Sequence, residues 1–222
     1  MQSFITNDGS KTLFHEAIGE HYHSKHGALQ ESKHVFLKSG LQYALEKNEL
    51  TAVSILEVGF GTGLNFILTA DFCTQNNLQL DYCGIEAYPL SKDIIESMDY
   101  ASYVQEETWD GFASSYEDAL KSETKVNELV RLEVDVVKLA DFTTEKRFDV
   151  IYFDAFAAIH QPEMWTTESL AIICQHLKPA GVFVTYAITG NLKRIMKSLG
   201  FQIEKAPGAP GKREMLRAVK NL

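Results

Sequence analysis

Residues 57–63 read Glu57-Val58-Gly59-Phe60-Gly61-Thr62-Gly63 and close an apolar run that begins at Val53. Glycines at three alternate positions let the backbone turn tightly and approach a ligand without a Cβ in the way. A helix-forming stretch from Leu64 to about Phe72 follows directly. The segment therefore predicts a strand, a ligand-binding turn and a helix, which together open an α/β fold that binds a nucleotide-type molecule.

Two common glycine motifs do not fit this turn. A dinucleotide fingerprint reads Gly-x-Gly-x-x-Gly, and counted from Gly59 its last glycine would fall at Leu64. A P-loop would need Gly-Lys-Ser/Thr after the turn, and none follows. The remaining pattern, Glu-x-Gly-x-Gly-x-Gly, resembles motif I of S-adenosyl-L-methionine-dependent methyltransferases, although the glycines could simply form a turn. We expect the cofactor S-adenosyl-L-methionine to be bound by Glu57, Gly59, Phe60, Gly61, Thr62 and Gly63.

Two further acidic residues follow predicted strands. Glu86 comes after strand 80–85 and lies 23 residues beyond Gly63, where a carboxylate can accept hydrogen bonds from both ribose hydroxyls. A dinucleotide ribose would be held in the same way, so Glu86 alone does not identify the cofactor. Asp135 follows strand 129–134, at a position that often meets the adenine amino group in this fold; a helix N-cap is the alternative. We expect both residues to bind the cofactor.

From residue 53 onward, strand and helix patterns alternate. Strands are expected at 53–58, 80–85, 129–134, 148–153, 182–186, 201–205 and 214–219, and helices at 64–72, 90–98, 109–121, 163–177 and 192–199. Pro179-Ala180-Gly181 is expected to stop the helix at 163–177. The turn at 207–211 is too short for a parallel crossover, so the last strand should be antiparallel. We predict a doubly wound, mostly parallel seven-stranded α/β sheet, the Rossmann-like fold of class I methyltransferases.

The first fifty residues are expected to form an extension, 1–50, packed on a methyltransferase domain, 51–222. Asn7-Asp8-Gly9 supplies turn chemistry for a hairpin over residues 3–15. A helix is expected from Glu31 to about Lys47, with Gly40 as a candidate interruption.

Asp154 follows the most apolar predicted strand, 148–153. Ligands of open α/β sheets bind beyond the carboxyl ends of the strands where the strand order reverses, and the first and fourth strands flank that point. Asp154 is therefore expected to act as the catalytic residue that holds an acceptor amine and takes its proton; a helix cap is the alternative. Phe156 and Trp165 could stack on a flipped base, or could simply belong to the core.

Charge is distributed unevenly along the chain. The net charge is −9, yet eight basic residues against two acidic ones give +6 from Tyr186 to the end. A basic C-terminal face can bind phosphates on an otherwise acidic molecule, and a merely solvated surface is the alternative.

Several other classes of protein and site are not indicated. No apolar run is long enough to cross a membrane, and we expect no secretory signal at the start. Three scattered cysteines without a Cys-x-x-Cys pair indicate reduced thiols in a cytoplasmic protein. Five of the seven histidines precede residue 35, but no Cys or Asp cluster follows with ligand spacing, so no metal is expected.

Together, these segments resemble the methyltransferase domain of the bacterial bifunctional enzymes that complete 5-methylaminomethyl-2-thiouridine at the wobble position of tRNA. The resemblance runs nearly end to end and rests on Tyr22-His23-Ser24, Glu31-Ser32-Lys33-His34-Val35-Phe36-Leu37, residues 57–66, Glu86-Ala87-Tyr88-Pro89-Leu90, Asp154-Ala155-Phe156-Ala157, Pro162-Glu163-Met164-Trp165-Thr166 and Gly211-Lys212-Arg213-Glu214-Met215-Leu216. The family often has Asp-Gly-Phe-Ala-Pro and Asn-Pro where this chain has Ala155, Ala158 and Gln161. These departures lie beside the expected pocket and bear on the identity of the uridine substituent.

The resemblance implies methylation of the aminomethyl group of the wobble uridine, with Asp154 as catalytic carboxylate and Glu86 on the ribose. It implies tRNA as the partner, with the anticodon arm bound by the basic C-terminal face that includes Lys212 and Arg213. The flavin-dependent oxidase half of the bifunctional enzymes has no room in 222 residues, so no flavin is expected and a separate oxidoreductase would act earlier. Two alternatives stay open: an amine methyltransferase with another acceptor, and a nucleotide-binding protein without catalysis.

Overall fold

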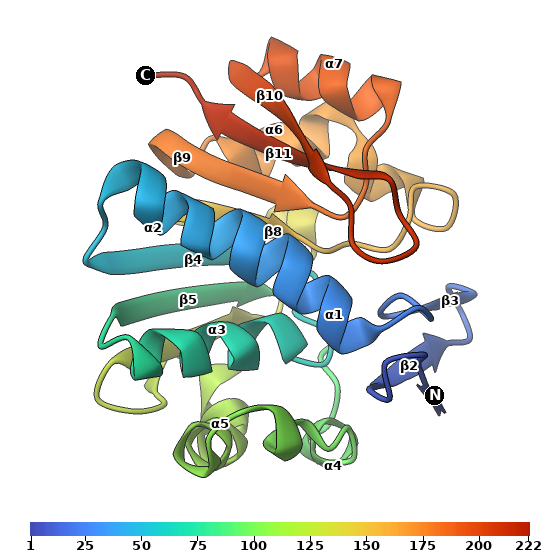
Figure 1. The fold of residues 1–222 in the computed structure, drawn as a ribbon, viewed down its shortest axis with the longest axis vertical. Helices are drawn as coiled ribbons and strands as arrows, with labels where there is room; N and C mark the ends of the chain where they lie inside the picture. Colours follow the sequence, from blue (N-terminus) through green and yellow to red (C-terminus); the bar gives the residue numbers. More distant parts are fainter.

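The computed structural model describes all residues, 1–222, and its centre is an eight-stranded sheet (Figure 1). The strand order is β10-β11-β9-β8-β4-β5-β7-β6. Strands β4, β5, β7, β8 and β9 are parallel, and β11 runs antiparallel to both β9 and β10. The bounds are β4 Ala52–Val58, β5 Gln79–Ile85, β6 Thr124–Lys125, β7 Val130–Asp135, β8 Phe148–Phe153, β9 Leu177–Thr185, β10 Phe201–Pro207 and β11 Glu214–Lys220.

The predicted doubly wound, mostly parallel sheet with an antiparallel last strand is confirmed. The strand β6 pairs antiparallel with β7 and adds an eighth member to the seven predicted. With only two residues, β6 is too short to leave an alternating pattern in the sequence.

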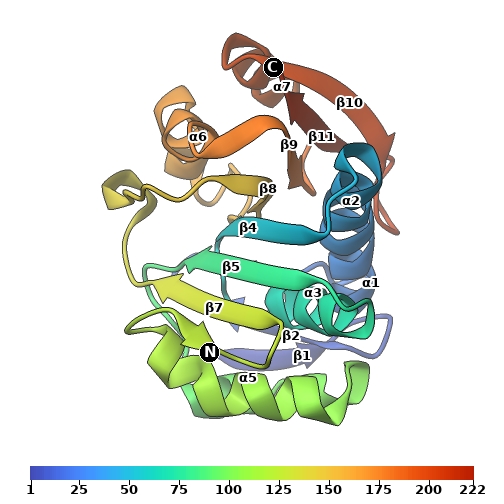
Figure 2. The same ribbon diagram turned by 90° about the vertical axis from the view of Figure 1, so that its left-hand side faces the viewer.

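Helices cover both faces of the sheet (Figure 2). On one face, the helical segment 28–48 packs with α3 and α5 against strand residues that include Ile55. On the other face, α6 and α7 pack against a second cluster that includes Leu56. Neighbouring residues of β4 therefore serve opposite faces, as the alternation of a strand requires. The helices and helical turns of the domain are α3 Leu64–Gln75, α4 Lys92–Glu96, η2 Tyr100–Tyr103, α5 Glu106–Ala119, η3 Leu139–Asp141, η4 Pro162–Trp165, α6 Thr167–Cys174 and α7 Gly190–Ser198.

The N-terminal residues form a small antiparallel sheet, β1 (Gln2–Ile5), β2 (Lys11–His15) and β3 (Glu20–His21). The predicted hairpin is present between β1 and β2, and β3 extends it. At its turn, Oδ1 of Asp8 accepts hydrogen bonds from Thr6 Oγ1 at 2.7 Å and from the Ser10 backbone N–H at 3.0 Å.

The predicted N-terminal helix begins three residues earlier than expected and is unbroken. It passes through α1 (Ala28–Ser32), the π-helical η1 (Lys33–Gln42) and α2 (Tyr43–Asn48). Gly40 does not interrupt it. A Cβ on Gly40 would lie 2.9 Å from side-chain atoms of both Tyr152 and Val184, so glycine here lets the helix lie close to the sheet. The domain boundary near residue 50 stays a prediction.

The predicted helix at 163–177 is wrong in its extent. The structure has the 3₁₀ turn η4 and the shorter α6, and Pro179-Ala180-Gly181 lies inside β9 instead of ending a helix. Proline is tolerated there because β11 pairs with β9 only at residues 182–185, and because the register of β9 against β8 shifts nearby. No helix in the structure has the length and apolar character needed to cross a membrane.

Candidate functional site

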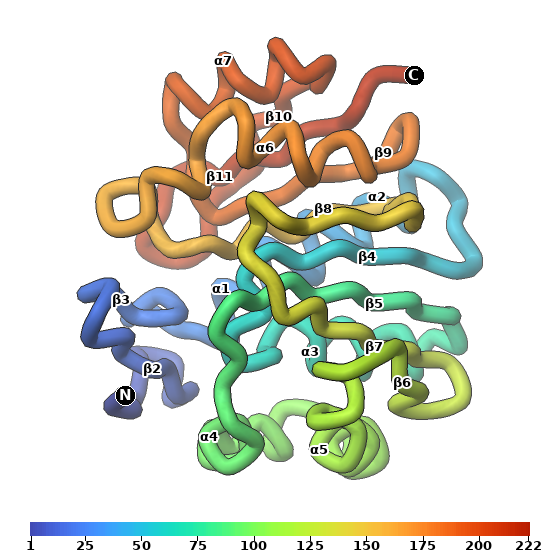
Figure 3. Tube along the Cα trace, turned by 180° about the vertical axis from the view of Figure 1, so that it is seen from behind, coloured from blue at the N-terminus to red at the C-terminus, as the bar shows by residue number.

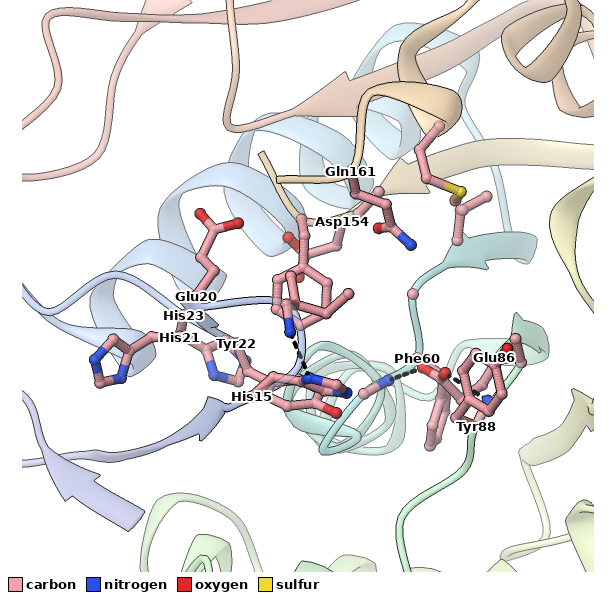
Figure 4. A pocket seen from close by; sticks show the side chains of 18 of the residues that line it. His15, Glu20, His21, Tyr22, His23, Phe60, Glu86, Tyr88, Asp154 and Gln161 are labelled. Atoms are coloured by element: carbon pink, nitrogen blue, oxygen red, sulfur yellow. Dashed lines mark hydrogen bonds between the residues drawn. The ribbon is translucent and has the colours of Figure 1, made fainter. Parts of the chain in front are cut away.

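A cavity of about 1150 Å³ opens at the carboxyl ends of β4, β5 and β8. The small N-terminal sheet lies beyond these strand ends (Figure 3). Its residues Phe14, Glu20 and His21 line the far side of the cavity. Figure 4 shows Phe60 and Glu86 on one side and Glu20 and His21 on the other, with Asp154 between them. Pockets for one small molecule usually measure about 300–1,000 Å³, so this cavity has room for a nucleoside-sized cofactor and part of a second molecule.

The glycine turn requires its glycines for conformational reasons. Gly59, Gly61 and Gly63 all have positive φ angles, of 85°, 53° and 77°, which glycine adopts at little cost. The segment from Gly59 to Thr62 lines the cavity, whereas Gly63 does not and instead lies against the ring of Phe112.

The same turn joins three strand ends. The backbone N–H groups of Gly59 and Phe60 donate to the Ile85 oxygen at 3.0 and 3.2 Å. A Cβ on Gly59 would lie 2.6 Å from the backbone oxygen of Asp154. The expected cofactor wall and the expected catalytic residue are therefore in direct backbone contact.

Glu86 lies against the turn from the end of β5. Its Oε2 accepts a hydrogen bond from the Gly61 backbone N–H, and its Oε1 accepts one from the Tyr88 backbone N–H, each at 3.0 Å. The side chain is half-buried and lines the cavity. A carboxylate held in this way still has lone pairs for ribose hydroxyls. The glycine backbone and Glu86 together fit the nucleoside part of S-adenosyl-L-methionine.

Besides Gly63, two other residues expected to bind the cofactor, Glu57 and Asp135, do not line the cavity. Glu57 is fully buried, and its oxygens accept hydrogen bonds from Asn65 Nδ2 and Tyr82 OH, each at 2.8 Å. Burial raises the pKa of Glu57 well above its ordinary value. Asp135 ends β7 with its carboxylate 3.6 Å from the Cys83 thiol, and residues 137–140 line the cavity in its place.

Asp154 lies in the cavity wall, as its position after β8 predicts. Its backbone N–H donates to the Val58 oxygen at 2.9 Å, and its Oδ2 accepts a hydrogen bond from Asn65 Nδ2 at 2.8 Å. Burial raises the pKa of Asp154 to about 8, and the negative charge of Glu31 adds to the rise, while the Asn65 hydrogen bond and the positive charge of Lys212 oppose it. A carboxyl with such a pKa can exchange a proton with an amine near neutral pH.

The N-terminal sheet and the segment that follows β3 supply cavity residues that the sequence did not place there, namely Phe14, His15, Glu20, His21, Tyr22, His23, Ser24 and Lys25. Glu20 fastens this wall to the Asp154 loop, because its Oε2 accepts a hydrogen bond from the Ala157 backbone N–H at 2.8 Å. Burial lowers the pKa of His23 to about 4, so this imidazole is neutral at pH 7. In the sequence, only the Tyr22-His23-Ser24 segment, which is part of the family resemblance, indicated that this part of the chain belongs to the site. No group of three His, Cys, Asp or Glu side chains gathers as a metal site within residues 1–222.

Of the two residues expected to stack on a base, Phe156 lies at the cavity and Trp165 does not. Phe156 lines the cavity, and its ring lies edge-on to those of His15 and Tyr22, with centroids 5.7 and 5.2 Å away. Trp165 does not line the cavity. It packs edge-on against Phe153 at 4.9 Å and donates its Nε1–H to the Phe156 oxygen at 2.8 Å. Trp165 therefore supports the Phe156 backbone from the core.

The two basic residues expected to bind tRNA, Lys212 and Arg213, also differ in their position relative to the cavity. Lys212 lines the cavity, forms an ion pair with Glu31 at 2.6 Å and lies 4.1 Å from the centre of the Tyr186 ring. Arg213 does not line the cavity.

A second group of basic residues gathers elsewhere. A shallow groove of about 340 Å³ lies between α7 and β10, and it is lined by Gly190, Lys193, Arg194, Lys197, Ile203 and Lys205. None of its four basic side chains forms an ion pair within the chain. The groove is therefore a concentrated positive surface.

The chain is similar in sequence to known methyltransferases and to MnmC proteins. A family model described as S-adenosyl-L-methionine-dependent methyltransferase matches residues 101–221. The tRNA 5-methylaminomethyl-2-thiouridine biosynthesis bifunctional protein MnmC of Leptospira borgpetersenii is 31% identical over 204 residues, which are 88% of this chain and 31% of that protein. Its counterpart in Leptospira interrogans is 30% identical over 221 residues, 96% of this chain and 34% of that protein. The chain thus spans about a third of the length of these relatives.

Solved structures share the fold. MNMC2 from Aquifex aeolicus has a TM-score of 0.77 at 24% identity, over 98% of this chain and 69% of that one. Magnesium protoporphyrin IX methyltransferase from Synechocystis, solved with S-adenosyl-L-methionine bound, has a TM-score of 0.53 at 12% identity, over 87% of this chain and 81% of that one.

Proposed function

Because the chain belongs to the S-adenosyl-L-methionine-dependent methyltransferase family, we propose that it methylates the aminomethyl group of 5-aminomethyluridine, or of its 2-thio form, at the wobble position of tRNA. The product would be the 5-methylaminomethyl nucleoside. The similarity to MnmC proteins over most of this chain supports this acceptor. The observation that carries the proposal is Asp154, a carboxylate in a cavity wall that touches the glycine turn.

The donor side of the site is proposed to consist of the segment from Gly59 to Thr62 and Glu86. S-adenosyl-L-methionine, when bound, supplies a methyl group on a positively charged sulfur. The glycine backbone would let the cofactor lie close to β4, and Glu86 would accept hydrogen bonds from its ribose hydroxyls. Gly63, Glu57 and Asp135 are proposed to shape this wall without touching the cofactor, because none of them lines the cavity.

The acceptor side is proposed to centre on Asp154. A protonated aminomethyl group has no free electron pair, so one N–H bond must break before nitrogen can act as a nucleophile. The proton would pass to a carboxylate oxygen of Asp154, and the electron pair would stay on nitrogen. With the pKa of Asp154 raised to about 8 by burial, this transfer has only a small energetic cost. Glu20 and the rings of Phe156 and Tyr22 would bound the space for the base.

The proposed RNA surface is the groove of α7 and β10, with Lys212 at the cavity mouth. Gly190 lines the groove and Tyr186 lines the cavity, and four residues of chain span at most about 14 Å. Phosphates next to a base held in the cavity would therefore come within reach of Lys193 and Lys197. Because phosphate contacts supply affinity without reading sequence, this surface suits an anticodon arm. A separate oxidoreductase is proposed to act earlier in the same pathway.

The test supplies labelled S-adenosyl-L-methionine and tRNA that carries 5-aminomethyluridine, and analyses the nucleosides by mass spectrometry. We expect methylaminomethyluridine with the wild type, and a rate about 10²- to 10⁴-fold lower with Asp154→Asn, while calorimetry shows unchanged cofactor binding. A normal rate with Asp154→Asn would refute the role of Asp154. Methylation of small amines or proteins but not of tRNA would refute the acceptor, and cofactor binding without any transfer would refute catalysis.

A further inference from the structure

Asn65 connects the buried carboxyl group of Glu57 to the partly exposed carboxyl group of Asp154 through one amide group. It lies in the first turn of α3 and is only 4% exposed. Its Nδ2 donates to Glu57 Oε1 and to Asp154 Oδ2, each at 2.8 Å. An amide nitrogen carries two hydrogens, so both of its donors are used on carboxylate oxygens.

The orientation of this amide is fixed from three directions. Ser32 Oγ, from α1, donates to Asn65 Oδ1. Glu57 holds the nitrogen side, and its other oxygen accepts a hydrogen bond from Tyr82 OH at 2.8 Å. If the amide were turned over, its oxygen would face the oxygens of Glu57 and Asp154. While Glu57 and Asp154 present acceptor oxygens to Asn65, their repulsion of the amide oxygen favours the arrangement that the structure shows.

We propose that Asn65 is the positioning residue of Asp154: it holds Oδ2, leaves Oδ1 for the acceptor amine, and is itself held by Glu57 and Ser32. This role rests on the proposed function of Asp154. It also gives Glu57 a place in the site: Glu57 would act beneath the turn, through Asn65, and not on the cofactor.

The hydrogen bond from Asn65 also has an electrostatic consequence. A donor bound to a carboxylate favours its charged form. Burial and Glu31 raise the pKa of Asp154, and the Asn65 hydrogen bond works against both. Without this donor, less of Asp154 would be ionised at neutral pH and able to accept a proton.

The test measures the titration of Asp154 directly, in the protein without acceptor, by carboxyl ¹³C NMR with labelled aspartate. The Asp154→Asn variant assigns the resonance. We expect Asn65→Leu to move the Asp154 midpoint upward by about one to two pH units, since a hydrogen bond to a charged group contributes about 1.5–3 kcal/mol. In the methylation assay, the acidic limb of the rate profile should move upward by the same amount.

Thr69→Val is the matched control. Thr69 lies one turn further along the same face of α3, is also buried, and its hydroxyl lies 3.4 Å from Tyr152 OH and contacts no carboxylate. We expect this variant to leave the Asp154 midpoint unchanged. If Asn65→Leu does not fold, Asn65→Ala, which admits water beside Glu57, should still raise the midpoint by about half a pH unit or more.

An unchanged Asp154 midpoint in the folded Asn65 variant would overturn the positioning role, even if the methylation rate fell. An equal shift in Thr69→Val would also overturn it, because the effect would then come from general disturbance of α3. The proposed function fails separately, when the wild type transfers no methyl group to the aminomethyluridine tRNA. The NMR titration does not depend on that acceptor, so the two failures are distinguishable.

Discussion

Replacing Asp154 by Asn should stabilise the protein, and increasingly so as the pH rises. Burial raises the pKa of Asp154 from its ordinary value of 3.8 to about 8 in the folded state. A carboxyl with a raised pKa opposes folding in its charged form. This cost is absent below the unfolded pKa of 3.8, grows as the pH rises toward 8, and is constant above it. An asparagine side chain cannot ionise, so the Asp154→Asn variant escapes the cost.

The size of the effect follows from the two pKa values. Their difference, at about 1.4 kcal/mol for each pH unit, sets an upper limit of about 6 kcal/mol above pH 8. Asp154 is partly exposed to the cavity, and water there screens the charge. We therefore expect the advantage of Asp154→Asn in the free energy of unfolding to grow by about 2 kcal/mol between pH 5 and pH 8.

Urea denaturation at several pH values between 5 and 9 measures this difference. Thr69→Val is the control, because it changes a buried side chain of α3 without removing a titrating group, and its difference from wild type should not vary with pH. The reasoning is refuted if the advantage of Asp154→Asn is constant over this range or shrinks as the pH rises. Either result would mean that the folded protein does not disfavour the charged carboxylate.

Three further outcomes test the site. Gly59→Ala should lower the free energy of unfolding by more than Gly9→Ala does, because a Cβ at residue 59 would lie 2.6 Å from the Asp154 oxygen. Gly9 has a similar positive φ but open space around it, so Gly9→Ala should cost about 1–2 kcal/mol. Equal losses for the two variants in urea denaturation would contradict the contact at Gly59. Glu86→Gln should weaken S-adenosyl-L-methionine binding by about 10- to 100-fold in calorimetry, through loss of charged hydrogen bonds to ribose, and unchanged affinity would place the ribose elsewhere. Lys197→Glu should weaken tRNA binding and reduce the slope of log affinity against log salt by about one to two, whereas an unchanged slope would exclude the α7 groove.

The fold could be predicted largely from the sequence, because each strand-and-helix unit carries its own local pattern. The exceptions have local causes. Residues 179–181 carry a strong stop signal, yet they lie in β9 where its partner strand β11 does not reach. Gly40 resembles a helix interruption, but its missing Cβ allows the helix to contact Tyr152 and Val184. At Gly40 a contact distant in the sequence outweighs a local preference, and at residues 179–181 the missing partner strand removes the hydrogen-bond requirement that would exclude proline.

The acceptor side of the site was less accessible to sequence reasoning. Asp154 could be placed because the carboxyl end of a parallel strand is a known position. Glu20 and Tyr22 could not, because their presence in the cavity depends on how the small N-terminal sheet packs against the strand ends. The hydrogen bond from the Ala157 N–H to Glu20 that fastens this wall joins residues 137 positions apart. Short-range patterns carry no information about such a contact.

Glu57 shows how a motif can locate a backbone and still misplace a side chain. The glycine turn directly follows Glu57, so its backbone is close to the expected cofactor. Along β4, however, Ile55 and Glu57 point to the face covered by α3, while Leu56 and Val58 point to the face covered by α6 and α7. On the α3 face Glu57 meets Asn65, and only through Asn65 does it reach the cavity. The alternation of side chains along β4 therefore directs Glu57 toward Asn65 and, through Asn65, toward Asp154. Glu57, which was expected to bind the cofactor, is better understood as a residue that supports the acceptor side of the site.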